Sequence, residues 1–201
     1  FVVGAIYSGT AGIVTVMFVL RKYMGFEQYI TKLHFDNLGK LLLVLSLLWT
    51  YINAIELFTG WYSGTSDEYE QLSFKLFGFY APLYWEMIVF CAAAPLLMIS
   101  KRFRTSFVPM LVLSIAINIG MYTERFLIVA TSLPRQYLPD AWGFYSPSLV
   151  EVSIMVGSFA VFTTLFLVFV KIFPSVSMYE VKETMDTPKS KAAIPQAGSL
   201  A

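Results

Sequence analysis

Apolar residues run through most of this chain in five long, nearly uninterrupted stretches. They cover residues 1–20, 38–59, 77–100, 106–131 and 148–173. Each stretch is long enough to cross about 30 Å of hydrocarbon as an α-helix, which rises about 1.5 Å per residue. None shows the alternating pattern of barrel strands, and only helices and closed barrels satisfy their backbone groups within lipid. The pattern therefore predicts an all-α, multi-pass transmembrane helix bundle.

The chain becomes polar and rich in Pro, Ser and Lys after Phe173. We therefore expect residues 1–173 to form the transmembrane part and residues 174–201 to form a C-terminal tail. A tail of this composition should be disordered from about residue 184. The first residues already have the character of a mid-helix segment, so we expect the sequence to be the later part of a longer protein.

Composition narrows the classes of protein and of site. Apolar residues make up 57% of the chain and charged residues only 13%, about half the charged share of soluble domains. A net charge of +1 with scattered charges provides no basic surface for nucleic acid. The single cysteine, Cys91, and the single histidine, His34, exclude an internal disulfide, a Cys-ligated cluster and a bis-His haem within this chain. We expect no metal or redox cofactor to be bound by this chain alone.

The loops between the predicted helices differ strongly in basic residues. Eleven Lys and Arg residues lie on one side: Arg21, Lys22, Lys32, Lys40, Lys101, Arg102, Arg104, Lys171, Lys182, Lys189 and Lys191. The loops of the other side carry only Lys75 and Arg135. By the positive-inside rule the first set is cytoplasmic, which predicts a cytoplasmic C-terminus and outward-facing loops at residues 60–73 and 133–147.

Away from the cytoplasmic ends of the apolar stretches, where Lys40 and Lys171 lie, five ionisable residues interrupt them, and all five fall in the predicted outer half of the membrane. They are Glu56, Glu86, Glu124, Arg125 and Glu151. Charges inside hydrocarbon are costly, so they mark candidate functional sites. Such a layer can relay protons or hold a polar headgroup, and the alternative is that Arg125 pairs with a glutamate only to lock the bundle. We predict a proton pathway through Glu86, Glu124 and Arg125, with Glu56 and Glu151 at its outer exit.

Further polar residues extend this hypothesis. Trp49, Asn53 and Glu56 are spaced by four and three residues, so they project from one face of a helix. Arg125 should pair with a carboxylate of another helix, because adjacent helical residues do not face each other. At the cytoplasmic side, His34 and Asp36 are candidates for proton uptake. The alternative for Asp36 is a structural role as the cap of the following helix.

Several segments carry a family resemblance. Residues 55–64 read Ile-Glu-Leu-Phe-Thr-Gly-Trp-Tyr-Ser-Gly, residues 77–85 read Phe-Gly-Phe-Tyr-Ala-Pro-Leu-Tyr-Trp, and residues 122–126 read Tyr-Thr-Glu-Arg-Phe. Together with the other helix ends of residues 1–183, they resemble the C-terminal half of polysulfide-reductase-type (NrfD-like) membrane subunits. The resemblance is closest to the quinol-oxidising membrane subunits of bacterial alternative complex III.

This resemblance implies a specific architecture and setting. The first four helices would be a four-helix bundle and the fifth an additional terminal helix. The subunit would sit in the bacterial cytoplasmic membrane beside an iron–sulfur subunit, a multihaem cytochrome c subunit and a paralogous NrfD-like subunit. Menaquinol or ubiquinol would be the substrate of the complex, with haem c and iron–sulfur clusters on the partners. The family's quinol site is associated with the first bundle, which lies outside this sequence.

We therefore expect an integral membrane subunit of a quinol-oxidising electron-transfer complex, without a catalytic residue or redox centre of its own. Its expected tasks are to provide a scaffold and a proton pathway. Two alternatives remain open at this stage. In one, the chain is a secondary transporter or ion channel whose buried carboxylates bind a cation or substrate. In the other, it is a purely structural membrane anchor for outer subunits.

Overall fold

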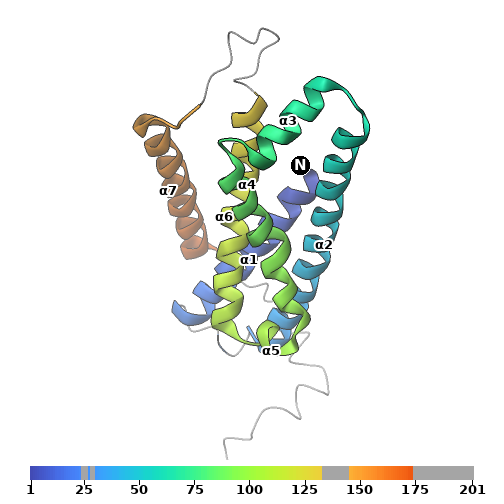
Figure 1. Ribbon diagram of the computed structural model, residues 1–201. Helices are drawn as coiled ribbons and strands as arrows, with labels where there is room; N and C mark the ends of the chain where they lie inside the picture. Colours follow the sequence, from blue (N-terminus) through green and yellow to red (C-terminus); the bar gives the residue numbers. More distant parts are fainter. Residues whose placement is uncertain (24–26, 28–29, 133–144, 174–201) are drawn as a thin grey trace, which may run out of the picture. The chain divides into compact units, whose positions relative to one another are not determined.

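The computed structural model of the protein describes residues 1–23, 27, 30–132 and 145–173 (Figure 1). All regular structure in these residues is helical. Five helical segments are long and apolar enough to cross a membrane. The predicted all-α, multi-pass class is therefore confirmed. The predicted tail at residues 174–201 lies outside the described residues, as does most of the loop at 133–147.

Four of the five predicted helices form close to their expected positions. They are α1 (Val2–Tyr23), α2 (Lys32–Tyr62), α6 (Phe107–Ser132) and α7 (Leu149–Ile172). The largest difference is at the start of α2, which begins at Lys32 instead of residue 38. Thr31 is its N-cap, and His34 closes a capping box by accepting a hydrogen bond from the Thr31 backbone N–H at 3.2 Å. This capping box starts the helix within the polar residues that precede the apolar stretch.

The third predicted helix is irregular and begins later than expected. It consists of α4 (Ala81–Ile88), a π-helical turn η1 (Val89–Ala93) and a 3₁₀ segment η2 (Ala94–Ile99). Pro95 explains the irregularity, because its nitrogen has no hydrogen to donate to the Cys91 carbonyl four residues earlier. Proline and π-helical turns are both established causes of a break in helical geometry. The prediction of one regular helix over residues 77–100 is therefore wrong in its detail.

Two short helices were not predicted. Helix α3 (Ser66–Phe77) occupies most of a segment expected to be an outer loop, and α5 (Lys101–Arg104) follows η2. The chain turns sharply from α2 into α3 at Gly64, whose φ of +66° lies in the left-handed region that favours glycine. Helix α3 mixes acidic, aromatic and apolar residues, so it lacks the long apolar run by which the other helices were predicted.

The chain divides into two compact units, Phe1–Tyr145 and Ser146–Ala201. In the first unit α1 packs against α6 and α2, and α4 packs against α6. Its core contains the fully buried Tyr7, Phe35, Leu42 and Ile117 together with several methionines. The outward faces of the same helices expose many large apolar side chains, as expected for helices that contact lipid.

Helix α6 approaches the irregular third span very closely at Gly120. A Cβ atom at this position would lie 2.6 Å from the Cys91 Sγ and 3.0 Å from the Phe90 Cβ. Only a residue without a side chain fits between these helices. The contact places the middle of α6 directly against the π-helical turn.

The second unit contains α7 and is described by itself. The helix starts with a capping box, in which the Ser148 hydroxyl accepts from the Glu151 backbone N–H at 3.3 Å. The Glu151 carboxylate in turn accepts from the Ser148 N–H at 2.6 Å. No side chain of α7 is buried within the described residues.

Candidate functional site

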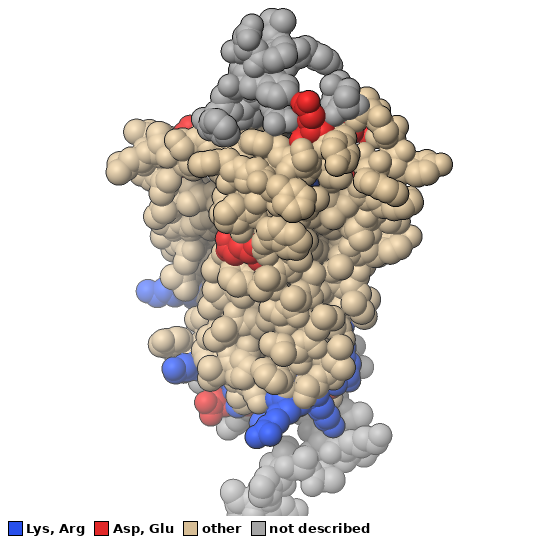
Figure 2. All heavy atoms as spheres, in the orientation of Figure 1, with Lys and Arg blue, Asp and Glu red and all other residues tan. Residues whose placement is uncertain are grey.

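Acidic and basic side chains gather at opposite ends of the first unit. Figure 2 shows most of the blue Lys and Arg side chains toward the end that carries α5, where one red carboxylate also lies, and the other red carboxylates farther toward the end that carries α3. We call the first the basic end, defined by Lys40, Lys101, Arg102 and Arg104. We call the second the acidic end, defined by Glu56, Glu68 and Glu70. Helix α2 runs from the basic end to the acidic end.

The buried face of α2 carries an unusual number of polar residues for a membrane helix. Asp36, Ser46, Trp49 and Asn53 are all buried on this face, at the three- and four-residue spacing of a single helical side. The predicted common face of Trp49 and Asn53 is therefore present. Glu56, which continues the spacing, has a side chain that is 64% exposed and lies at the acidic end. The buried polar line of α2 thus reaches the surface at Glu56.

Glu124 of α6 points into the bundle and meets this polar line. Its Oε1 accepts a hydrogen bond from the Trp49 indole N–H at 2.8 Å. Its Oε2 lies beside Gly4 of α1, where a Cβ atom would be only 3.2 Å away. The carboxylate is therefore held between three helices, and its hydrogen-bond partner is a donor that cannot act as an acceptor. Sequence reasoning identified Glu124 but did not predict Trp49 as its partner.

Glu86 belongs to the same region. Both Glu86 and Glu124 are close enough to the Cys91 thiol to interact with it electrostatically. Glu86 is partly buried on α4, the helix that packs against α6. The two glutamates predicted to form the deeper part of a proton pathway therefore come from two helices that pack together, α4 and α6.

The break in the third span creates a polar junction near the middle of the bundle. The Cys91 carbonyl, left without its usual donor by Pro95, accepts from the Tyr7 hydroxyl at 3.1 Å and from the Ser46 hydroxyl at 2.9 Å. A second hydroxyl pair, Thr15 and Ser114, is 2.9 Å apart. Buried carbonyls and hydroxyls are costly when unpaired, so the two bonds to the Cys91 carbonyl stabilise the broken helix, whereas the Thr15–Ser114 bond joins α1 to α6. The Ser46 hydroxyl lies about one turn of α2 before Trp49, the partner of Glu124, on the side of the basic end.

Toward the acidic end, hydrogen bonds and a cation continue the line. The Tyr84 hydroxyl donates to the Asn53 Oδ1 at 3.0 Å. The ring of Tyr84 faces the Lys75 ammonium at 5.3 Å, and Lys75 forms an ion pair with Glu56 at 3.0 Å. Lys75 was not among the predicted site residues. Its position on α3 explains why, since the segment was expected to be a loop.

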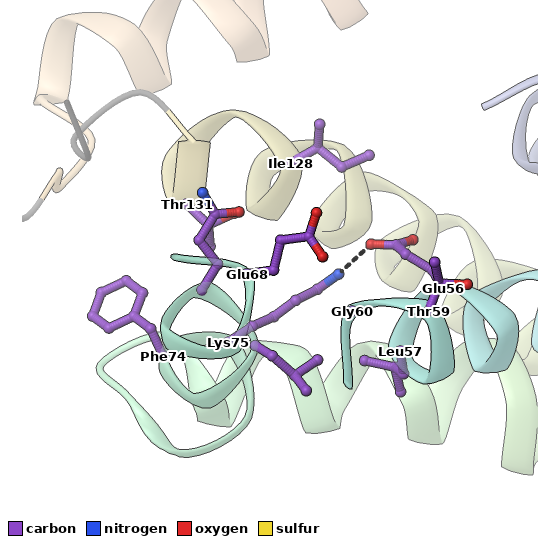
Figure 3. A pocket seen from close by; sticks show the side chains of 11 residues that line it. Glu56, Leu57, Thr59, Gly60, Glu68, Phe74, Lys75, Ile128 and Thr131 are labelled. Carbon is purple, nitrogen blue, oxygen red and sulfur yellow. Dashed lines mark hydrogen bonds and ion pairs between the residues drawn. The ribbon is translucent and has the colours of Figure 1, made fainter. Parts of the chain in front are cut away.

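A pocket of about 530 Å³ opens beside this ion pair, between the ends of α2 and α6 and the whole of α3. Figure 3 shows the Lys75 side chain reaching across the pocket to Glu56, with Glu68 pointing toward the same space. The polar lining comes from Glu56, Thr59, Glu68, Gln71, Lys75 and Thr131. Apolar walls are provided by Leu57, Leu72, Phe74 and Ile128.

At the basic end, Asp36 and His34 have clear structural partners. Asp36 accepts from the Arg104 Nε at 2.8 Å and pairs with the Lys40 ammonium at 2.7 Å. Arg104 also donates to the carbonyls of Met98 and Ile99, which ties η2 to α2. The alternative role of Asp36 as a helix cap is wrong, because Thr31 is the cap. The ring of His34 takes part in that cap through its Nδ1.

Arg125 is not paired with two of its three predicted partners. Among the described residues of the first unit, it forms no ion pair with Glu56 or Glu86, and its guanidinium lies over the Phe1 ring at 4.9 Å. Glu124, its neighbour in sequence, turns inward to Trp49 instead. Adjacent residues on a helix diverge by about 100°, which separates the two side chains. The sequence offered Glu56, Glu86 and Glu151 as candidate partners of Arg125. Neither Glu56 nor Glu86 is within ion-pair distance of it in the first unit, and a pair with Glu151, which belongs to the second unit, stays a prediction.

Comparison with known proteins places these features in a family. The family described as polysulphide reductase, NrfD, matches residues 1–135, which is about two thirds of the chain. No curated protein sequence matches the chain. Members of the NrfD family are integral membrane subunits of quinone-interacting oxidoreductases and typically associate with iron–sulfur subunits. The chain belongs to the NrfD (polysulphide reductase) family and is an integral membrane subunit of a quinone-interacting oxidoreductase complex.

Proposed function

We propose that this chain serves a quinol-oxidising complex of the alternative complex III type and relays protons through the acidic half of its bundle. The observation that carries the proposal is the Glu124 carboxylate, inserted between α1 and α2 and bonded to Trp49 at 2.8 Å. An ionisable group held in this way inside a membrane bundle indicates proton handling more strongly than a surface charge does.

The proposed relay follows the length of α2 and uses side chains of α2 and of the helices packed beside it. Glu124 and Glu86 are the titratable groups at its inner end. The Asn53–Tyr84 bond leads from this level toward Lys75, and Glu56 is the outlet at the acidic end. Ser46 and Glu56 are ten residues apart, so this line spans about 15 Å at 1.5 Å per residue. Internal water would complete the steps between side chains, as is common in buried polar sites.

The basic half of the bundle has a different character. Leu42 and Leu45 are buried on α2 between Asp36 and Ser46. This apolar layer separates the Asp36–Arg104 pair from the hydroxyl groups of Tyr7 and Ser46. We therefore assign the relay to the acidic half. Proton uptake at His34 and Asp36, the part of Arg125 in the pathway and an outer exit at Glu151 stay predictions.

The proposal includes the setting of the complex. Menaquinol or ubiquinol is the proposed electron donor, and the acceptors are an iron–sulfur subunit and a multihaem cytochrome c subunit that carry the redox centres. A paralogous NrfD-like subunit is a further proposed partner. We place the protein in the bacterial cytoplasmic membrane with its C-terminus in the cytoplasm and its acidic end outside, as the distribution of Lys and Arg favours.

The test replaces Glu124 and Glu86 by Gln, one at a time, in the complete complex reconstituted into vesicles. Each change keeps the shape of the side chain and removes its titratable proton. We expect coupled proton release to fall by tenfold or more, since proton transfer by a positioned group contributes about 10²–10⁴ in rate. Glu70→Gln is the control, because Glu70 is exposed on α3 and outside the relay.

Each result has a defined meaning. Wild-type proton release in both variants would refute the relay. Loss of assembly, measured by the haem and iron content of the purified complex, would favour the purely structural anchor. A purified complex without haem and iron–sulfur partners, combined with solute transport, would favour the transporter or channel.

A further inference from the structure

We infer that the pocket between α2, α3 and α6 binds the headgroup of a phospholipid that carries a primary ammonium, such as phosphatidylethanolamine. The pocket shares Glu56 and Lys75 with the proposed relay, but the inference is tested by lipid binding and not by proton release. It rests on the size of the pocket, the balance of its charges and its level in the predicted membrane.

The size and lining of the pocket suit an amphiphile. Its volume of about 530 Å³ lies within the range of about 300–1,000 Å³ that is typical of small-molecule sites. The lining combines an apolar wall of Leu57, Leu72, Phe74 and Ile128 with charged groups that point into the same space (Figure 3). A molecule with one polar head and an apolar tail can contact both parts.

The charges favour a ligand that brings a cation with N–H donors. Two carboxylates, Glu56 and Glu68, face one ammonium, that of Lys75. Lys75 is paired with Glu56 at 3.0 Å. Glu68 accepts from the Ser63 hydroxyl, and no basic residue pairs with it among the residues that the structure describes. A primary ammonium would neutralise Glu68 through charge-assisted hydrogen bonds.

The same site can hold the phosphate of such a lipid. The Lys75 ammonium has three N–H donors, so it can donate to a phosphate oxygen while keeping its bond to Glu56. A phospholipid without an ammonium would offer only the phosphate and would be repelled by the two carboxylates. The pocket therefore discriminates between headgroups by charge and by hydrogen bonding.

Exposed aromatic residues place the pocket at the level of lipid headgroups. Phe58, Trp61 and Tyr62, on the last turns of α2, are each about 60% exposed or more. The rings of Phe58 and Tyr62 stack with centroids 5.9 Å apart. Aromatic side chains of this kind concentrate at the boundary between hydrocarbon and water. A ligand in the adjacent pocket would thus have its head at the boundary and its tail in the bilayer.

The experiment measures which lipids remain bound to the complete complex in native mass spectrometry. The complex is purified from nanodiscs that contain equal amounts of phosphatidylethanolamine, phosphatidylcholine and phosphatidylglycerol. We expect preferential retention of phosphatidylethanolamine. Phosphatidylcholine is the critical comparison, since its quaternary ammonium has the same charge but no N–H donor.

Three variants locate the binding. Glu68→Gln should lower the preference for phosphatidylethanolamine about tenfold, the effect expected for the loss of a hydrogen bond to a charged group. Glu70→Gln is the matched control on the same helix and should leave the preference unchanged. Leu72→Trp fills the apolar part of the pocket and should lower retention of the lipid without changing any charge.

Several outcomes would refute the inference. Equal retention of the three lipids would do so, as would equal effects of Glu68→Gln and Glu70→Gln. Displacement of phosphatidylethanolamine by a soluble quinone analogue would assign the pocket to quinone instead. Lipid retention is measured without turnover. A failure of the lipid inference can therefore be told apart from a failure of the proposed proton relay.

Discussion

Among the acidic residues of the bundle, Glu124 is distinguished by its donor. Its partner is the neutral indole of Trp49, whereas Asp36 and Glu56 each face Lys or Arg side chains. An indole N–H stabilises a carboxylate without fixing it in a strong ion pair. Asp36, by contrast, is held by two cations, Arg104 and Lys40.

Replacement of Trp49 by Phe tests this arrangement. The variant keeps the ring and removes the donor to Glu124, whose hydrogen bond is of the charged type worth about 1.5–3 kcal/mol. We expect coupled proton release by the complete complex to fall about tenfold or more. Trp85→Phe is the control, since Trp85 is half exposed and donates to the backbone carbonyl of Leu76. Equal behaviour of the two variants would contradict the role of Trp49.

The sequence supported some residue-level predictions better than others. Trp49 and Asn53 do share a buried face, because helical spacing fixes which residues project together. Spacing does not fix how far a helix is rotated against its neighbours. For that reason the partner of Glu124 on another helix, and the position of Arg125 beside the Phe1 ring, could not be derived from the sequence.

At the scale of elements, the long apolar stretches predicted four of the five spans closely. The third span differs because a single residue, Pro95, breaks the hydrogen-bond ladder of an otherwise apolar segment. Helix α3 was missed because a short amphipathic helix has no long apolar run. Lys75 and Glu68 lie on this helix, so the pocket that they line was beyond sequence reasoning as well.

The contact of α6 with the third span predicts a large effect of Gly120→Ala. The new Cβ would lie 2.6 Å from the Cys91 Sγ, so the helices must separate. Overpacking of this kind costs about 1–3 kcal/mol. We expect a lower thermal unfolding midpoint of the purified complex. Gly157→Ala is the control, because, apart from the adjoining backbone of α7 itself, no atom of the described residues lies within 4 Å of a Cβ at that position.

A double variant separates this clash from other effects of alanine. Cys91→Ala removes the sulfur atom that the new Cβ would meet. Combined with Gly120→Ala, it should recover part of the lost stability, while the 3.0 Å approach to Phe90 remains. An unchanged midpoint in Gly120→Ala alone would show that the two helices are not in contact as described.

For the whole molecule, the separation of charge predicts its orientation. Residues of the acidic end should face outward and those of the basic end inward. We expect an impermeant thiol reagent, added to intact cells, to modify Glu70→Cys but not Lys101→Cys. The native Cys91 is fully buried and should give little background. Labelling of Lys101→Cys alone would reverse the assigned topology.

The shared Cys91 carbonyl also has a consequence for how the protein is made. Tyr7 is 84 residues away from this acceptor in sequence, and Ser46 is 45 residues away. Both hydroxyls therefore enter the membrane, during synthesis, before the atom that will accept their hydrogen bonds. Membrane helices commonly insert first and associate afterwards. Until the third span inserts, the Tyr7 and Ser46 hydroxyls must form hydrogen bonds with other groups. Insertion of the third span then allows the three helices to associate through the Cys91 carbonyl.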